Sequence, residues 1–245
     1  MVTANTRALD GVKAVMCDFY GTVVDMQGGL IEAITPYLER KNYTANTASR
    51  VVTWWRRNHF ENSMIDALLH REHMPYREVG RQTVHYVLDR AGIDHTDEEV
   101  ADLVAQIERL KPFPDVVEAL AEIKATGIKL VILSNGDPDM LAHGVPYSGT
   151  DHLWNRVVSV AEASSFKPHR DTYRTAAALV DVEPGDVLFA ANHAFDCVGA
   201  KAAGMRTAFI NRRRRPFGNS HYAPDLEVDD FAHLASTLTS AHNRT

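Results

Sequence analysis

Five short apolar runs, separated by much longer stretches, constrain this 245-residue chain more than any other feature of its sequence. Four of the runs stop directly before a polar residue. Apolar runs of this length, bounded by polar residues, are typical of buried parallel strands. The runs cover residues 12–17, 128–133, 156–160, 186–191 and 207–210.

Helical signals fill the stretches between the later runs. Residues 114–126 begin with a proline near the first helical position and end at Gly127, and residues 194–203 end at Gly204. Residues 169–180 follow the same logic. Strand and helix in repetition predict an α/β fold, a Rossmann-like parallel sheet with right-handed crossovers.

The segment between residues 28 and 111 departs from this alternation. It has almost no β-rich run, and apolar residues recur at helical spacing, as at Ile31, Ile34 and Leu38. A simple crossover needs only about a dozen residues. We therefore predict an inserted all-helical cap over residues 28–111 and a core domain made of residues 1–27 and 112–245.

Composition excludes several classes of protein. Lys and Arg number 26 against 32 Asp and Glu, a net charge of −6, which disfavours a nucleic-acid partner. No apolar run approaches the roughly 20 residues of a membrane span, and the first residues lack a secretory pattern. Two cysteines cannot form a disulfide framework. These features predict a cytoplasmic protein with no membrane partner.

Polar residues with catalytic chemistry follow four of the predicted strands. Ligands bind open α/β sheets beyond the carboxyl ends of the strands, so these side chains are expected to converge. Any one of them alone is consistent with an ordinary polar loop, but a set at successive strand ends is not. A lysine, a hydroxyl and two carboxylates suit covalent catalysis by an aspartate. The residues are Asp18, Ser134, Asn135, Lys167, His193 and Asp196.

These residues belong to four ordered motifs. They are Asp18-Phe-Tyr-Gly-Thr22, Leu133-Ser-Asn-Gly136, Lys167-Pro168 with Tyr173, and Asp196. In this order the motifs resemble those of the haloacid dehalogenase superfamily, and the resemblance extends over the whole chain, including the cap position. It implies a haloacid dehalogenase-like core with an inserted cap.

The superfamily consists mostly of magnesium-dependent phosphatases, which carry a second aspartate two residues after the nucleophile. Tyr20 occupies that position here, and Asp196 lacks an acidic neighbour. With those oxygen ligands missing, a hard divalent cation is poorly held. A phosphate ester also needs its leaving oxygen protonated, whereas a halide leaves without a proton. We therefore expect halide chemistry with no metal and no cofactor.

Further details resemble the L-2-haloacid dehalogenase branch. The pair Trp55-Arg56 looks like its halide-binding pair. Ala191 and His193 stand where the best-known members have serine and asparagine, and a histidine there resembles a sub-branch that includes enzymes acting on fluoroacetate. The resemblance implies hydrolysis of haloacetate, L-2-halopropionate or fluoroacetate to a 2-hydroxy acid, and a homodimer.

The resemblance also implies a role for each motif residue. Asp18 would attack the α-carbon, Thr22 would orient it, and Lys167 would offset the crowded negative charge. Asp196, with His193, would position or deprotonate the water that cleaves the ester. Arg56 would both bind the halide and take part in catalysis by stabilising the halide as it leaves. The residues expected to bind substrate or halide are Tyr20, Trp55, Arg56, Ser134, Asn135, Tyr173 and Phe195.

Other interpretations stay open at this point. A phosphatase of the same fold, a catalytically idle binding protein, and a hydrolase that opens a strained carbon–nitrogen ring all fit the core motifs. The run of four arginines at residues 212–215 is interpreted as a solvated loop.

Overall fold

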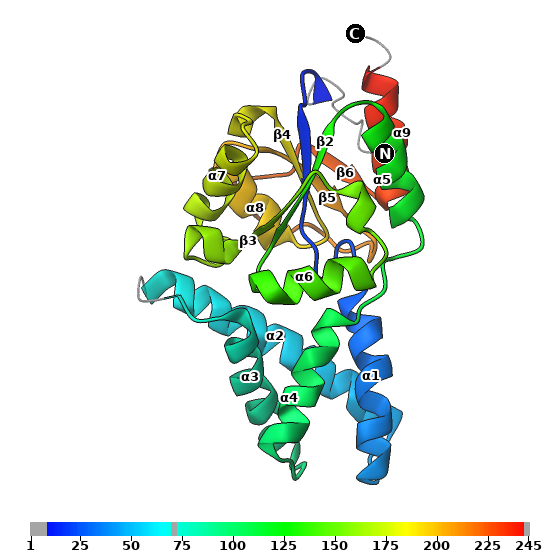
Figure 1. The fold of residues 1–245 in the computed structure, drawn as a ribbon, viewed down its shortest axis with the longest axis vertical. Coiled ribbons are helices and arrows are strands. Elements are labelled where there is room, and N and C mark those ends of the chain that lie inside the picture. Colours follow the sequence, from blue (N-terminus) through cyan, green and yellow to red (C-terminus); the bar gives the residue numbers. More distant parts are fainter. Residues whose placement is uncertain (1–8, 70–72, 243–245) are drawn as a thin grey trace.

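The computed structural model describes residues 9–69 and 73–242. In these residues a six-stranded sheet, parallel throughout, forms the centre of the molecule, in the order β3-β2-β1-β4-β5-β6 (Figure 1). The predicted α/β class is confirmed, and all five predicted strands are present. The strands are β1 (Ala14–Cys17), β2 (Lys129–Ser134), β3 (Arg156–Ser159), β4 (Val187–Ala191), β5 (Arg206–Ile210) and β6 (Leu226–Val228).

Strand β1 lies at the point where the chain reverses its direction across the sheet. The chain runs outward from β1 through β2 to β3, then returns to place β4 on the other side of β1. Connections leave the carboxyl ends of β1 and β4 in opposite directions, which opens a crevice between them. The first and fourth predicted strands therefore flank the expected site.

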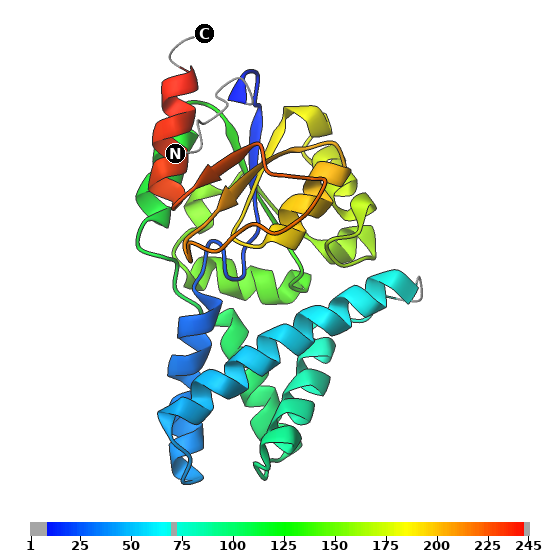
Figure 2. The same cartoon turned by 180° about the vertical axis from the view of Figure 1, so that it is seen from behind.

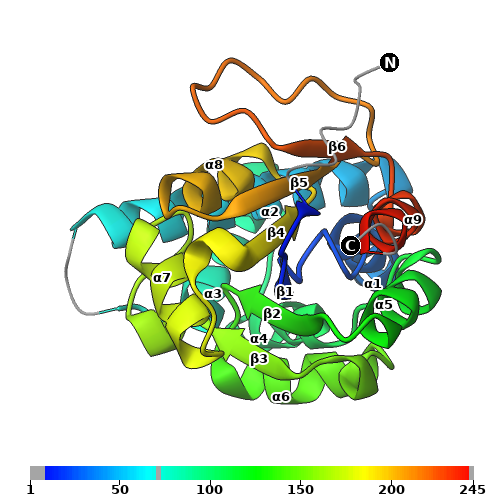
Figure 3. The same ribbon diagram turned by 90° about the horizontal axis from the view of Figure 1, so that it is seen from above.

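Helices cover both faces of the sheet. Seen from above, α7 and α8 lie on one face and α5 and α9 on the other, while α6 packs against β3 (Figure 3). Helices α6 and α9 and strand β6 lie in segments where the sequence analysis assigned no element. The core helices are α5 (Val116–Ala125), α6 (Pro138–Tyr147), α7 (Arg170–Leu179), α8 (Ala194–Ala202) and α9 (Phe231–His242), with 3₁₀ turns η3 (Asp151–Leu153), η4 (Val160–Ala163) and η5 (Pro184–Asp186).

Four further helices lie together beyond the carboxyl edge of the sheet (Figures 1 and 2). Pro75 precedes α3 and Gly92 ends it in a left-handed conformation, as the breaker positions predicted. The described residues between 28 and 111 contain no strand, yet α1 begins at Met26, ahead of the predicted boundary. The division into two domains stays a prediction. These helices are α1 (Met26–Arg40), α2 (Ala45–Leu69), α3 (Tyr76–Ala91) and α4 (Asp97–Ala105), followed by the 3₁₀ turn η2 (Gln106–Glu108).

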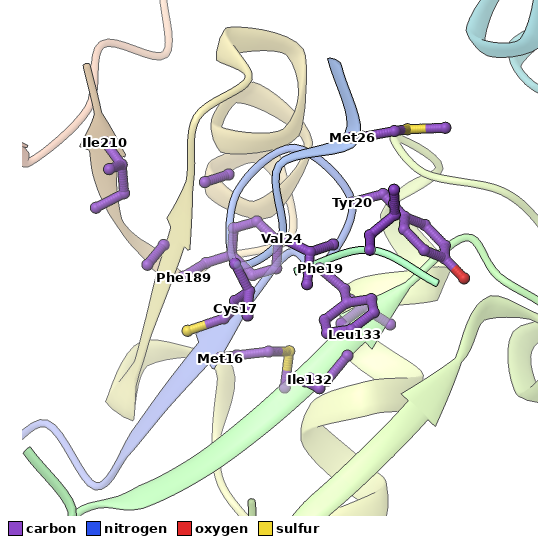
Figure 4. Packing of buried hydrophobic residues seen from close by; sticks show 14 of the residues in the cluster. Met16, Cys17, Phe19, Tyr20, Val24, Met26, Ile132, Leu133, Phe189 and Ile210 are labelled. Carbon is purple, nitrogen blue, oxygen red and sulfur yellow. The ribbon is translucent and has the colours of Figure 1, made fainter. Parts of the chain in front are cut away.

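The core sits where the central strands meet the loop after β1. Figure 4 shows Met16 and Cys17 of β1 beside Ile132 of β2, with Phe19 of the loop packed above them. All four side chains are buried. Strands β1 and β4 are buried along their whole length, as expected for a sheet covered on both faces. In the described part of the chain, no helix combines the length and the apolar character that crossing a membrane requires.

Candidate active site

The carboxyl ends of β1 and β4 carry a buried cluster of three charged side chains. Lys167 Nζ lies 2.8 Å from Asp18 Oδ1 and 2.8 Å from Asp196 Oδ2. It also donates to the Leu133 carbonyl oxygen at 3.0 Å. All three charged side chains are buried, where an unpaired charge is costly. The single ammonium thus uses its donors to hold two carboxylates and the end of β2.

The backbone fixes Asp18 directly after β1. Its N–H donates to the Ala190 carbonyl of β4 at 3.1 Å, so the sheet pairing continues up to the carboxylate. Thr22 Oγ1 donates to Asp18 Oδ2 at 2.6 Å and accepts the Asn192 N–H at 3.0 Å. The loops after β1 and β4 are therefore tied together around Asp18.

The surroundings shift the pKa values of the two carboxyl groups, Asp18 and Asp196, in opposite directions. Burial opposes ionisation of Asp18, but the Lys167 ammonium and the His193 ring outweigh it and hold the pKa of that carboxyl well below its usual range. Burial raises the pKa of Asp196, and the nearby charge of Asp18 adds to the rise. Burial alone would lower the pKa of Lys167, yet the two carboxylates raise it. Asp18 is thus the carboxylate that stays ionised, as a nucleophile requires.

Asp196 supports the cluster from behind. It is the third residue of α8 and is fully buried. Its Oδ1 accepts the Tyr173 hydroxyl at 2.6 Å, while Oδ2 accepts Lys167. With both oxygens occupied, Asp196 anchors the lysine that neutralises Asp18.

His193 approaches Asp18 from the start of α8. Its Nδ1 lies 3.2 Å from Asp18 Oδ2. Gly21, at φ +86°, makes room for this approach: a Cβ there would lie 2.9 Å from His193 Cε1 and 3.0 Å from Arg56 Nη2. The glycine in the first motif is therefore needed for its conformation and for its missing side chain.

Arg56 reaches the same place from α2. Its Nη1 donates to Gln27 Oε1 at 2.8 Å, a neutral partner. Its Nε is buried without a hydrogen-bond partner among the described residues. The adjacent Trp55 side chain is buried. Arg56 thus brings a positive charge that no hydrogen-bonded carboxylate neutralises.

A cavity of about 270 Å³ opens above Asp18. Seven of the residues predicted for the site line it, and they come from both the sheet and the helical segment. Met26, Arg57, Phe60, Tyr76 and Arg213 complete its described lining. The seven are Asp18, Tyr20, Arg56, Asn135, Lys167, His193 and Phe195.

The other five predicted residues lie outside that lining, among the described residues, and are buried behind it. Thr22, Tyr173 and Asp196 hold the cluster by the hydrogen bonds given above. Ser134 Oγ accepts the Gly136 N–H at 3.2 Å, and Trp55 packs in the core. Direct contact of these five side chains with a substrate stays a prediction.

A family model for haloacid dehalogenase-like hydrolases matches residues 12–204. The chain belongs to that family. This haloacid dehalogenase-like hydrolase is 34% identical over 201 residues to the (S)-2-haloacid dehalogenase of Xanthobacter autotrophicus, an alignment that covers 82% of this chain and 76% of the relative. The family resemblance of the four motifs is confirmed.

Solved structures of such enzymes have the same fold. The L-2-haloacid dehalogenase from Xanthobacter autotrophicus with chloropropionic acid covalently bound superposes with a TM-score of 0.81 at 29% identity, covering 93% of this chain and 98% of the other. A defluorinating L-2-haloacid dehalogenase, Rha0230, gives a TM-score of 0.81 at 31% identity, with 93% and 95% covered.

The donor set of this haloacid dehalogenase-like hydrolase does not fit a divalent cation. Lys167 donates to both Asp18 and Asp196, so the ammonium occupies the space between the carboxylates. Tyr20 places a phenol where a second carboxylate would be needed. Within residues 9–69 and 73–242, no group of three or more acidic, histidine or cysteine side chains is arranged to hold a metal. Metal-independent activity stays a prediction.

Two aromatic wall residues were missed from the sequence of this hydrolase. Phe60 lies one helical turn after Arg56 on α2, and its ring centroid is 4.0 Å from that of Phe195. Tyr76 stacks on Tyr20 at 5.9 Å. The i, i+4 spacing from Arg56 was a usable signal for Phe60. No comparable signal marked Tyr76, which opens a helix far along the chain.

The interpretation of residues 212–215 as a solvated loop is wrong for its first arginine, whereas Arg213, Arg214 and Arg215 are exposed. Arg212 pairs with Asp115 at 2.5 Å and lies 4.3 Å from the centroid of the Phe113 ring. Arg213 lines the cavity above Asp18. The position of Arg212 depends on tertiary contacts with residues just before α5, and a run of four arginines does not predict those contacts.

Proposed function

We propose that this hydrolase cleaves the carbon–halogen bond of short 2-haloacids, through an ester of Asp18, to release halide and a 2-hydroxy acid. The class predicted from the sequence, a hydrolase acting on carbon–halide bonds, is confirmed at the level of its relatives, which are named (S)-2-haloacid dehalogenases. Haloacetate, L-2-halopropionate and fluoroacetate are the substrates we propose. The defluorinating relative supports including fluoroacetate.

One observation carries the proposal. An ionised carboxylate, Asp18, faces a cavity in which Lys167 offsets its charge and Tyr20 occupies the position of the phosphatases' second aspartate. A leaving group that needs protonation finds no carboxylic acid at position 20. A halide, which departs as an anion, needs only positive charge and hydrogen-bond donors.

In the first half-reaction, an oxygen of Asp18 forms a bond to the α-carbon while the carbon–halogen bond breaks. The halide leaves with the bonding electron pair, and the configuration at the α-carbon inverts. Arg56 and Asn135, both in the cavity wall, are proposed to stabilise the departing anion. Phe195 and Phe60 form an apolar wall beside them, which strengthens those charges.

In the second half-reaction, water attacks the Asp18 carboxyl carbon and the bond from that carbon to the product oxygen breaks. The water proton is accepted by a base, and the product oxygen takes up a proton as the carboxylate reforms. We assign the base to His193, because it lines the cavity and lies 3.2 Å from Asp18. Asp196, with both oxygens occupied, is assigned to hold Lys167.

The finer expectations for the assembly belong to the same proposal. We propose a cytoplasmic homodimer whose cap, residues 28–111, closes over the core. Light scattering coupled to size-exclusion chromatography tests the dimer, for which a mass near 55 kDa, twice 27.3 kDa, is expected.

A halide-release assay tests the function. Chloroacetate, fluoroacetate and both enantiomers of 2-chloropropionate are offered with and without EDTA. We expect release from haloacetates and the L enantiomer, unchanged by EDTA. Turnover of phosphate esters that is lost in EDTA and restored by magnesium would instead assign the protein to the phosphatases.

Oxygen-18 water tests the covalent step. In a single turnover with excess enzyme, the product oxygen should come from Asp18 and carry no label, while the label enters the Asp18 side chain. Asp18→Asn should abolish turnover and leave the fold intact, because the amide is nearly isosteric but a far weaker nucleophile. Labelled product from the first turnover would overturn the covalent mechanism.

A further inference from the structure

Two cavities meet at Arg56 and Arg213. The first is the cavity above Asp18, and the second, of about 700 Å³, lies against the start of α1 and the loop after β5. Arg56 and Arg213 line both cavities. Arg212 and Arg215 line only the second, together with Asp25. An arginine-rich chamber therefore adjoins the catalytic cavity through a shared pair of guanidinium groups.

The turn after β5 is built to present Arg213. The side chain of Asn211 makes two hydrogen bonds across the turn: its Nδ2 donates to the Arg215 carbonyl at 2.9 Å, and its Oδ1 accepts the Arg215 N–H at 2.8 Å. Arg214 N–H donates to the Asn211 carbonyl at 3.0 Å. On one side of Arg213, the ion pair between Arg212 and Asp115 anchors the turn to the core. The connection that contains this turn runs along the core on the side of α2 (Figure 2).

Two of the arginines around the cavities already have a charge partner. Arg57 pairs with Glu61 at 2.8 Å, and Arg212 pairs with Asp115. Arg213, in contrast, makes no hydrogen bond or ion pair with any described residue. Asp25, the acid of the second cavity, uses its carboxylate to accept the Gly28 N–H at the start of α1.

The guanidinium groups of Arg56 and Arg213 interact electrostatically. Burial lowers the pKa of Arg56 and the positive charge of Arg213 lowers it further, while the carboxylates of Asp25 and Asp18 offset part of the shift. Two like charges that are not bridged by a hydrogen-bonded carboxylate repel each other, and a bound anion relieves that repulsion. The Nε of Arg56 is buried and has no hydrogen-bond partner among the described residues.

We propose that Arg213 and Arg56 form an anion-binding site at the junction of the two cavities. Its ligand is a small monovalent anion, either the carboxylate of an incoming substrate or the halide that leaves Asp18. Positive potential at a cavity mouth raises the local concentration of anions and the rate of their capture. The part of this inference that concerns turnover rests on the proposed function; the binding of anions does not.

Binding of inert anions tests the site without turnover. Dissociation constants of propionate and of bromide are measured by NMR titration for the wild type, Arg213→Gln and the matched control Arg214→Gln. Arg214 is exposed, as Arg213 is, but it is not among the described residues that line either cavity. We expect Arg213→Gln to weaken binding about three- to tenfold and Arg214→Gln to change it less than about 1.5-fold.

The two anions distinguish the sources of the ligand. Weakening of propionate alone assigns the site to the substrate carboxylate, and weakening of bromide alone assigns it to the halide. Equal binding by both variants overturns the site. If anion binding weakens but the wild type releases no halide from any haloacid, the proposed function fails and the site stands.

Discussion

Lys167 determines what the buried carboxylates can do. Its Nζ lies between Asp18 and Asp196, at 2.8 Å from a carboxylate oxygen of each. Its charge keeps Asp18 ionised in a cavity that would otherwise favour the neutral acid. The nucleophile and its counter-ion therefore form one unit.

Removing the ammonium should make stability depend on pH with a defined sign. In Lys167→Met two buried carboxyls face each other, so the pKa of at least one rises above its value in the unfolded chain. A carboxyl with a raised folded pKa stabilises the fold below the unfolded pKa, and this stabilisation is lost as pH rises through the folded pKa. We expect the variant to lose about 3–5 kcal/mol at pH 8 and to recover part of it at pH 5.

Chemical denaturation at the two pH values measures this change. Lys201→Met is the matched control, because Lys201 pairs with Asp225 at a partly exposed position. That variant should lose at most about 1 kcal/mol, without the recovery at pH 5. A Lys167→Met protein that is more stable at pH 8 than at pH 5 would contradict the assignment.

His193 should control the second half-reaction. We expect His193→Gln to release about one halide per active site rapidly and then to slow by about 10²–10³-fold, because the ester forms but water lacks its base. Rapid-quench halide assays and the mass of the protein measure the burst and the trapped ester.

His143→Gln controls for the loss of a histidine elsewhere. His143 lies on α6, is mostly exposed and pairs with Glu108. The His143→Gln variant should hydrolyse its substrate at the wild-type rate. Steady turnover by His193→Gln without an accumulated ester would assign the water-activating role to another group, such as Asp196.

At the scale of elements, the loop after β1 shapes the site. The Phe19 carbonyl accepts the N–H groups of Thr22, Val23 and Val24 at 3.0 to 3.3 Å, and Gly21 donates to the Val24 carbonyl at 2.9 Å. This tight turn places Asp18 and Thr22 on the same side. It also leaves Gly21 as the narrow space between His193 and Arg56.

Comparing two glycines that have the same backbone conformation distinguishes the effect of backbone strain from the effect of side-chain clashes. Gly21 has φ +86° and Gly127 has φ +87°, but a Cβ at Gly127 would meet nothing within 4 Å. Alanine at either position should cost about 1–2 kcal/mol of stability through the left-handed backbone. Only Gly21→Ala should also lower kcat/KM, by about tenfold or more, because its methyl displaces His193 and Arg56. Thermal unfolding and halide release measure the two effects, and equal activity of both variants would contradict this account.

At the scale of the whole molecule, Asp137 joins the core to the helical segment. It lies in the loop after β2, yet its carboxylate accepts the N–H groups of Tyr76 at 2.7 Å and Arg77 at 2.9 Å, at the start of α3. Pro75, the residue before α3, makes no side-chain cap of its own. A core residue therefore caps a helix whose first residue lines the catalytic cavity.

Loss of this cap should loosen α3 and, with it, the cavity wall. We expect Asp137→Ala to lose about 1–2 kcal/mol, to speed hydrogen exchange at the start of α3 and to raise KM more than it lowers kcat. Asp139→Ala is the control, because Asp139 pairs with Arg77 at an exposed position and should cost at most about 1 kcal/mol. Identical exchange of α3 in the two variants would contradict a capping role.

The sequence alone determined five of the six strands, most of the helices and the order of the motifs. Runs such as residues 12–17 and 186–191 form strands because their apolar residues must be buried on both faces, a requirement that is local and visible. Asp18, Lys167 and Asp196 converge because parallel strands end at one edge. The family could be inferred because those motifs can be read directly from the order of residues along the chain.

Only the tertiary structure decided which side chains reach the cavity. Tyr173 and Asp196 are buried and lie outside the described lining of the cavity, whereas the exposed Arg213, for which the sequence predicted only a solvated loop, belongs to that lining. Asp137 caps a helix 60 residues away in sequence. The direction of a side chain depends on what packs around it from distant parts of the chain, and local spacing carries no record of those neighbours.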